Sequence, residues 1–379
     1  MFMQFFTIQL LQRTNTTMTF RVFGLWIVLV CGACQSASPA TPAETSWLET
    51  PSLKVTSTQM DTAFSEGESG APGDGTFTLE NVSQTKILHT LHGHTGQIID
   101  FIFLPDDQFL SLGSDLTLRR WDINSGEEVN SLKLDSAPIY TGGISPVGDM
   151  FAIEGPNHLI QIRDSQDGGI LNQLPGHTAF VMSYAFSLDD SLLATGDSNG
   201  SIITWEVNTA SPVYVFAGHS SPIGALAFSP DNALLASGGV EGSHDIKIWD
   251  LASGIETISF NKHTGNVYDL AFSPDGTLLA SASGDRTIKL WDIASEKELQ
   301  TFSGHRGFVY SVEFSLDGKM LASSDIDGNI IFWEIATGKE LKRVKGHTDL
   351  VEPIKFSKAG CHLASGSFDS NIIIWSACE

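Results

Sequence analysis

Three residues in the stretch 263–292 have the types found in hydrolytic active sites: His263, Ser281 and Asp285. In such sites a histidine takes the proton of a serine hydroxyl, and a carboxylate orients the imidazole ring. Trp291 follows the aspartate closely and completes a set of four. Taken alone, this set predicts acyl-transfer chemistry at this point of the chain.

The same set recurs along the chain at an almost constant distance. Its last member is a tryptophan, replaced once by Arg163, and successive positions are separated by 42, 42, 44, 42, 42 and 42 residues. A histidine lies 27 to 30 residues before each tryptophan. An enzyme needs one catalytic constellation, whereas this sequence repeats the set, so we interpret the four residues as structural.

Short apolar segments must position these polar residues. Within 263–292, two alternating segments are joined by Ser-Pro-Asp-Gly at 273–276, and a third ends at Trp291. Proline presets φ and glycine supplies a positive φ, so we expect a hairpin turn there. A single three-stranded sheet cannot bury its own faces, and we expect it to stack against its copies.

The period, with its Gly-His and Trp-Asp dipeptides, resembles the WD-repeat family over residues 85–379. The resemblance implies an all-β fold, a seven-bladed β-propeller of four-stranded antiparallel blades. Residues 85–91 would supply the fourth strand of the last blade and close the ring.

The resemblance also implies that each set forms a buried hydrogen-bond relay from Trp through Ser and His to Asp. A two-residue insertion at 241–244 leaves the acidic residue of the fourth blade open. The predicted relay residues are His94, Ser111, Asp115 and Trp121; His177, Thr195, Asn199 and Trp205; His219, Ser237 and Trp249; His263, Ser281, Asp285 and Trp291; His305, Ser323, Asp327 and Trp333; and His347, Ser365, Asp369 and Trp375.

The second blade has lost the set, and Asp135, Ile153, Asn157 and Arg163 stand at its four positions. Its packing must be rebuilt or left looser, and we expect it to be the least stable blade. Divergence explains this most simply; a specialised contact is the alternative.

In the family, partners often dock on the face that carries the loop after the histidine. By register, that face holds an unusually apolar set of residues. Clustered exposed aromatic residues mark interaction sites, so we predict a protein- or peptide-binding face centred on blades five to seven. The alternative is that these rings pack against neighbouring loops. The predicted partner-binding residues are Tyr140, Phe180, Met182, Tyr268, Phe308, Tyr310, Ile326, Leu350 and Phe368.

The N-terminal residues 1–33 are typical of a signal peptide, with an apolar run at 22–30 after Arg21. Gly32, Ala33 and Cys34 resemble a bacterial lipoprotein processing site, which implies lipid attachment to Cys34 and anchoring to a membrane on the extracytoplasmic side. Translation from Met18 would give a shorter leader. Residues 34–84 are rich in Ser, Thr, Pro and Gly and acidic, so we expect a disordered tether.

Net charge, the lack of cofactor motifs and the cysteines narrow the range of possible functions. A formal net charge of −23 disfavours nucleic acid as a partner. No cofactor or metal motif is found, and Cys361 and Cys378 lie opposite each other by register, so a disulfide is a candidate there. The sequence therefore predicts a cell-envelope, membrane-tethered, monomeric propeller that is a non-catalytic scaffold for proteins. The alternatives are a small-molecule-binding, glycan-binding or hydrolytic propeller with its site at the central channel, or a cytoplasmic scaffold with a wrongly assigned start.

Overall fold

The computed structural model describes residues 17–22, 25–30, 76–136, 138–358 and 361–378. The chain divides into two compact units, 1–68 and 69–379. In the first unit, β1 (Thr17–Val22) and β2 (Leu25–Val30) form an antiparallel pair. Cys34 and the predicted tether up to residue 75 lie outside the described residues. No helix among the described residues is long and apolar enough to cross a membrane.

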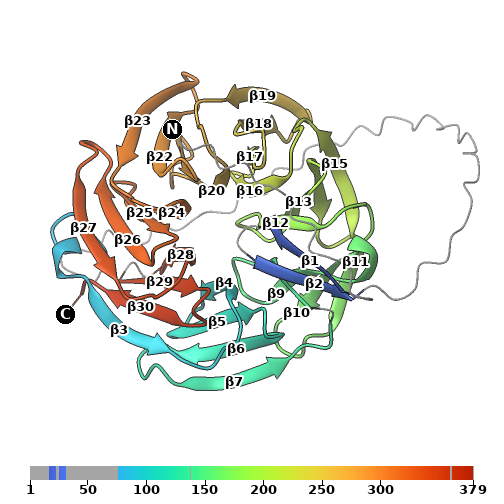
Figure 1. Ribbon diagram of the computed structural model, residues 1–379, viewed down its shortest axis with the longest axis horizontal. Coiled ribbons are helices and arrows are strands. Elements are labelled where there is room, and N and C mark those ends of the chain that lie inside the picture. The colour runs from blue at the N-terminus through green and yellow to red at the C-terminus, as the bar shows by residue number, and fades with distance from the viewer. Residues whose placement is uncertain (1–16, 23–24, 31–75, 137, 359–360, 379) are drawn as a thin grey trace, which may run out of the picture. The chain divides into compact units, whose positions relative to one another are not determined.

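The second unit is a ring of blades, and its described residues form seven four-stranded antiparallel sheets (Figure 1). The predicted fold class is confirmed. Blades one to three are β4 (Ile98–Phe103), β5 (Gln108–Gly113), β6 (Thr117–Asp122), β7 (Glu128–Lys133); β8 (Gly142–Ile144), β9 (Met150–Glu154), β10 (Ile160–Asp164), β11 (Ile170–Leu174); and β12 (Val181–Phe186), β13 (Leu192–Asp197), β14 (Ser201–Glu206), β15 (Ser211–Ala217). Blades four to six are β16 (Ile223–Phe228), β17 (Leu234–Gly239), β18 (Ile246–Asp250), β19 (Ile255–Phe260); β20 (Val267–Phe272), β21 (Leu278–Ser283), β22 (Thr287–Asp292), β23 (Lys297–Ser303); and β24 (Val309–Phe314), β25 (Met320–Asp325), β26 (Asn329–Glu334), β27 (Glu340–Lys345).

The seventh blade closes the ring with a strand from the other end of the domain. It contains β28 (Val351–Phe356), β29 (His362–Ser367), β30 (Ile372–Ser376) and β3 (Lys86–Leu91). The pairs Lys86–Ser376 and Leu91–Ile372 fix the register of β3 on β30. The expected closure by residues 85–91 is therefore confirmed, and it joins the first and last strands of the propeller in one blade.

Turn chemistry and inter-blade packing explain the repeated sheets. In the fifth blade, Gly276 has φ +71° and its N–H donates to the carbonyl of Ser273 at 2.8 Å, as expected for the predicted hairpin. Buried side chains of β22 and β23, including Leu290 and Phe302, pack against Val312 and Phe314 of β24. The core therefore lies between neighbouring blades, so each blade depends on the next.

The predicted tether boundary at residue 84 is wrong, because residues 76–84 belong to the propeller. Phe77 is buried, stacking on Phe332 at 5.6 Å between ring centroids and meeting Phe356 edge-on at 5.4 Å. The Asn81 side chain accepts from Thr78 N–H at 2.8 Å, and η1 (Val82–Gln84) then leads into β3. An aromatic residue in a polar stretch thus anchors the N-terminal segment on blades six and seven.

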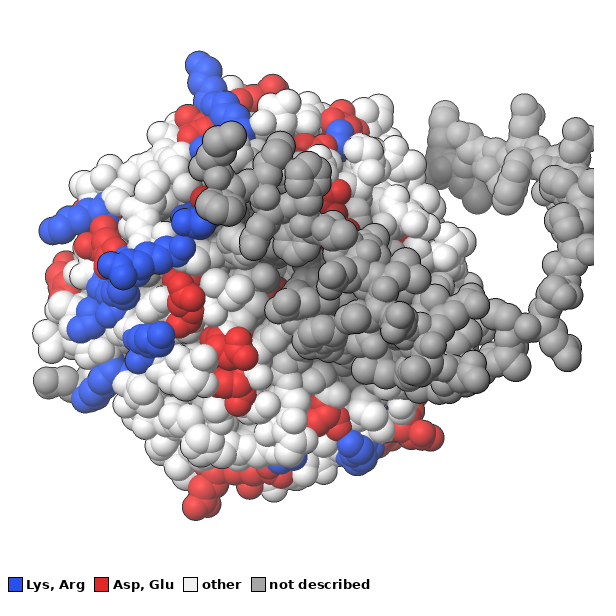
Figure 2. All heavy atoms as spheres, in the orientation of Figure 1, with Lys and Arg blue, Asp and Glu red and all other residues white. Residues whose placement is uncertain are grey.

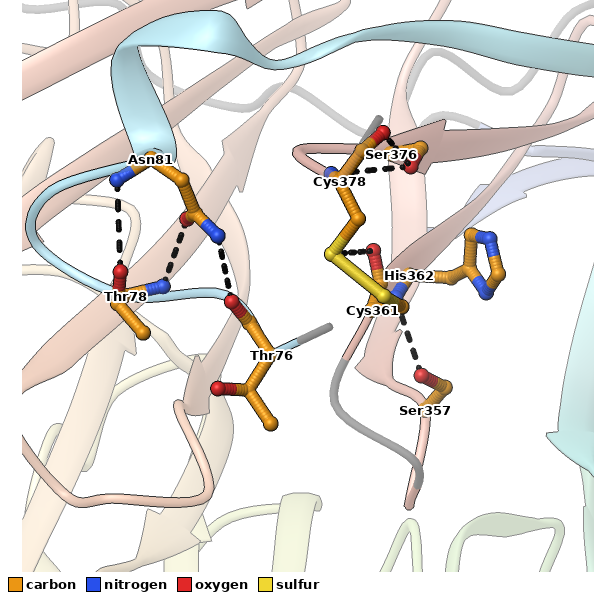
Figure 3. The surroundings of a disulfide bond; sticks show 8 residues. All are labelled: Thr76, Thr78, Asn81, Ser357, Cys361, His362, Ser376 and Cys378. Carbon is orange, nitrogen blue, oxygen red and sulfur yellow. Dashed lines mark hydrogen bonds between the residues drawn. A yellow bond between two sulfur atoms is a disulfide. The ribbon is translucent and has the colours of Figure 1, made fainter. Parts of the chain in front are cut away.

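A covalent bond joins the last hairpin. Cys361 and Cys378, which the repeat register places opposite each other, form a disulfide with a Cα–Cα distance of 5.9 Å. Figure 3 draws this bond together with the turn formed by Thr76, Thr78 and Asn81. The two ends of the propeller chain are therefore secured in the same blade, one by strand pairing and one by a disulfide.

Candidate functional site

The relay is clearest in the fifth blade. The Trp291 indole N–H donates to Ser281 Oγ at 2.9 Å, Ser281 Oγ lies 2.7 Å from His263 Nε2, and His263 Nδ1 lies 2.7 Å from Asp285. With the Nδ1 tautomer protonated, every group in this chain has a partner. Five further blades contain the same chain, with histidine to hydroxyl distances of 2.7–2.8 Å and indole to hydroxyl distances of 2.8 Å.

Two of the predicted acidic members are wrong. His177 bonds Asp197 at 2.9 Å instead of Asn199, and His305 bonds Asp325 at 2.7 Å instead of Asp327. Asp197 and Asp325 end their strands, two residues before the predicted positions, and each also accepts the backbone N–H of the predicted residue. In the fourth blade the longer turn supplies Asp245, at 3.1 Å from His219. An aspartate at the end of the strand and an aspartate in the turn thus both bring a carboxylate to Nδ1 of the relay histidine.

The relay cannot perform the hydrolysis that its residue types permit. The hydroxyl-bearing residues are fully buried in all six blades, and each hydroxyl is bonded to a tryptophan where a substrate carbonyl would have to approach. Burial alone would raise the pKa of the Asp285 carboxyl, but hydrogen bonds from His263 and Thr287 hold it well below its usual range. The set therefore stabilises the turn that carries Asp285.

The second blade holds a different network around the same site. Arg163, at the tryptophan position, donates to Gln161 Oε1 at 2.6 Å, to the carbonyl of Asp135 at 3.2 Å and to that of Gly168 at 3.1 Å. Both side chains are buried. The rebuilt packing is thus an arginine–glutamine pair, which satisfies backbone carbonyls in place of the Trp–Ser–His–Asp chain.

The predicted partner-binding residues divide into exposed and packed groups. Phe308 is 40% exposed and Ile326 is 37% exposed, and their backbones are hydrogen-bonded to each other at 3.0 Å. Tyr310 and Leu350, by contrast, are only 7% and 4% exposed. Both are therefore buried, contrary to their prediction as exposed docking residues, and Tyr310 is covered by Tyr268 of the neighbouring blade.

Ring contacts join neighbouring blades on this loop face. Tyr268 stacks on Tyr310 with centroids 4.3 Å apart and planes at 14°, and Tyr140 meets Phe180 edge-on at 6.5 Å. The remaining predicted residues, Met182 and Phe368, are half-buried, as are Tyr140, Phe180 and Tyr268. The alternative that the rings pack together thus holds for the tyrosine pair, while Phe308 and Ile326 stay open to solvent.

A group of carboxyls on the inner strands was not singled out from the sequence, and Asp269, Glu313 and Glu352 belong to it. Asp269 of β20 accepts from Val312 N–H at 2.9 Å and from Ser311 Oγ at 2.8 Å of β24. Burial, with the nearby charge of Asp269, raises the pKa of both Glu313 and Glu352 to about 8. The charge of Asp269 on blade five therefore acts on the acids of blades six and seven.

Two further observations limit the chemistry of this group. Lys355 of β28 forms an ion pair with Asp100 of β4, with Nζ and Oδ1 2.6 Å apart, so blade seven is tied to blade one. In the described part of the chain, no three His, Cys, Asp or Glu side chains are arranged to hold a metal ion. The signal that could have found the group is an acidic residue five to eight positions after the histidine, within the inner strand of the blade.

A comparison with known families matches this repeating geometry. The model of the WD domain, G-beta repeat matches residues 85–122, 168–206, 210–250, 254–292, 296–334 and 338–376. The chain belongs to the WD-repeat family. The six matched segments contain the six relays, and the first three strands of the second blade, β8 to β10, lie in the interval between the first two segments.

Curated WD-repeat relatives match over limited segments. Rat apoptotic protease-activating factor 1 is 30% identical over 134 residues, which is 35% of this chain and 11% of the relative. Human WD repeat-containing protein 36 is 37% identical over 87 residues, 23% of this chain and 10% of the relative. A guanine nucleotide-binding protein subunit beta from Lymnaea stagnalis is 27% identical over 161 residues, 41% and 45% respectively. The alignments thus span under half of each relative.

Proposed function

We propose that this WD-repeat propeller is a non-catalytic scaffold that binds protein partners through its loop face, with its contact centred on the sixth blade. The observation that carries the proposal is the exposed apolar pair Phe308 and Ile326, at the entry and in the turn of the same blade. Exposed aromatic and aliphatic side chains with no scaffold role are the groups that contribute most of the energy when an interface buries them.

The surroundings of this pair suit a docking site. The stacked Tyr268 and Tyr310 form a rigid wall on the fifth and sixth blades, so a partner would lose little side-chain entropy on contact. The relay beneath fixes the loops, because His305 and Asp325 are buried and bonded at 2.7 Å. Membership in a family that includes a G-protein subunit is consistent with protein partners.

Affinity purification with cross-linking tests the proposal. The double variant Phe308→Ala/Ile326→Ala removes the exposed pair, and we expect it to lose captured partners while its melting temperature stays within a few degrees of the wild type. Leu316→Ala is the matched control, because Leu316 is exposed in the β24–β25 turn at the other end of the same strand. Equal capture by the double variant and the wild type would disprove docking at this pair.

We further propose that the propeller is exported and tethered to a membrane by lipid on Cys34. The apolar run at 22–30 and the Gly32-Ala33-Cys34 sequence support this proposal. Metabolic labelling with palmitate should mark the wild type and leave Cys34→Ala unlabelled. Equal labelling of the two proteins would exclude Cys34 as the lipid attachment site, and no labelling with the protein found in the cytoplasm would favour the cytoplasmic alternative.

A second candidate function is the binding of a small cationic molecule at the central channel, favoured by the interacting acids Asp269, Glu313 and Glu352. A cation would lower the cost of ionising these carboxyls together. We would expect a polyamine to raise the melting temperature of the wild type at pH 8 more than that of Glu352→Gln. An equal effect on both proteins would exclude this site.

A further inference from the structure

The outermost strand of each blade presents an unpaired backbone edge, and the seven edges differ in how they are protected. A lysine on an edge strand discourages pairing with another chain. The described edge strands with lysine are β3, β7, β23 and β27, which carry Lys86, Lys133, Lys297, Lys342 and Lys345. The edge strands β11, β15 and β19, on three consecutive blades, contain neither lysine nor arginine.

These three edges also expose branched apolar side chains. Val215 of β15 is 65% exposed, Ile255 of β19 is 60% exposed and Leu171 of β11 is 52% exposed. Val213 on the same strand as Val215 is 46% exposed, so two valines of β15 face solvent. Apolar residues such as Leu299 are exposed on β23 as well, but there a lysine stands on the same strand. Only β11, β15 and β19 combine apolar exposure with the absence of cations.

The charge of this flank indicates what it can bind. Residues 164–246 contain nine Asp and Glu residues and no Lys or Arg. Asp167 and Glu206 are exposed in the turns that lead into β11 and β15. The next cation, Lys247, is held by Glu256 with Nζ and Oε2 2.7 Å apart. In Figure 2 most of the visible Lys and Arg spheres lie on the left, where Figure 1 places β23 and β27.

The exposed apolar side chains and the acidic charge of this flank together favour one class of binding partner. Two copies of the chain that met symmetrically through β15 would place one acidic flank against the other, which like-charge repulsion opposes. A membrane surface with anionic lipids would be repelled for the same reason. An extended segment with alternating apolar and basic side chains would cover the valines, pair with the open backbone and meet the acidic turns.

We propose that the outer edges of blades two to four, centred on β15, bind an extended basic segment of a partner protein by strand addition. Among the described strands, β15 pairs with β14 alone, and none pairs with its other side along 213–217. Pro212 lacks an N–H group, so the added strand pairs from Val213 onward. This surface lies on the rim of the propeller and is distinct from the loop-face pair Phe308 and Ile326.

Binding of a synthetic peptide of alternating lysine and valine tests the proposal. Fluorescence anisotropy would measure its affinity for the full chain at physiological salt, and hydrogen exchange would locate it. We expect new protection of amides in β15, and loss of affinity by about tenfold or more in Val215→Lys. Leu299→Lys is the matched control, since it adds the same charge at an equally exposed edge residue of β23, and it should change affinity less than about twofold.

The remaining outcomes overturn the proposal. Equal weakening by Val215→Lys and Leu299→Lys would show attraction to overall charge alone, and equal binding of a glutamate–valine peptide would remove the charge argument. Absence of peptide binding, or protection confined to other strands, would exclude strand addition at β15. Self-association of the free protein that Val215→Lys abolishes would identify a second copy as the occupant. Unchanged thermal melting of both variants verifies that they are folded.

Discussion

Blade two and blade five occupy equivalent places in the ring, yet different groups hold them together. In blade five, Trp291, Ser281, His263 and Asp285 form one continuous chain of hydrogen bonds. In blade two, Arg163 donates hydrogen bonds to Gln161 and to two backbone carbonyls. The fold therefore requires that the buried polar groups be satisfied, and several residue sets meet that requirement.

Blades two and five also differ in the length of their inner strands and in the lysine content of their outer edge strands. The inner strand β8 of blade two has three residues, whereas β20 of blade five has six. The edge strand β11 lacks the lysine that β23 has. Blade two thus combines the loss of the relay with a shorter inner strand, and its edge belongs to the proposed rim-binding flank together with those of blades three and four, which keep the relay.

The largest expected effect is on blade five. Ser281→Ala leaves the buried Trp291 N–H and His263 Nε2 without partners, so we expect a loss of about 2–4 kcal/mol in the free energy of unfolding. Urea denaturation measures it. Ser295→Ala, an exposed turn residue of the same blade, is the control and should change stability by less than about 0.5 kcal/mol. A Ser281→Ala protein as stable as the control would refute the structural role of the relay.

A smaller loss is expected in blade two. Arg163→Met leaves Gln161 Oε1 and two carbonyls without a donor, at a cost of about 1–3 kcal/mol. Adding Gln161→Leu removes one of the orphaned groups, so the double variant should be more stable than the single one. Arg306→Met, at an exposed arginine, serves as the control. A double variant less stable than Arg163→Met would show that the pair does not act as a unit.

Hydrogen exchange compares the two blades directly in one protein. With a short inner strand and fewer side-chain hydrogen bonds, blade two should open at a free energy lower by on the order of 1 kcal/mol. We expect amides of β9 and β10 to exchange faster than those of β21 and β22, as the sequence already predicted. Equal protection of these strand pairs would mean that the arginine–glutamine network replaces the relay without loss.

The repeat period was enough to predict the ring, the blade count and the closing strand, because a sheet that cannot bury its own faces must stack at that period. It could not decide between Asp197 and Asn199, or between Asp325 and Asp327. A carboxylate at the strand end and one two residues later both reach the histidine, so register alone leaves the choice open.

Features that depend on contacts between different blades were also beyond the sequence. The burial of Tyr310 against Tyr268 and the clustering of Asp269 with Glu352 arise from packing between blades, which has no period along the chain. Phe77 was missed because its partners, Phe332 and Phe356, are more than two hundred residues away. An isolated aromatic residue just before the closing strand was the available signal.

The smallest expected effect is a difference in the sign of the pH dependence. Hydrogen bonds hold the pKa of Asp285 below its usual range, so its contribution to stability is present at neutral pH and is lost as pH falls below about 4. Burial raises the pKa of Glu154 in blade two, despite its hydrogen bonds from His158 and Val181, so its contribution is present at low pH and is lost as pH rises through the folded-state pKa. Between pH 7 and pH 4, the protection of blade two should therefore rise relative to that of blade five.

Hydrogen exchange corrected for intrinsic rates measures this difference, and Glu154→Gln should flatten the response of blade two alone. Parallel changes in both blades, or an unaltered response in Glu154→Gln, would show that these carboxyls do not set the local stability of their blades.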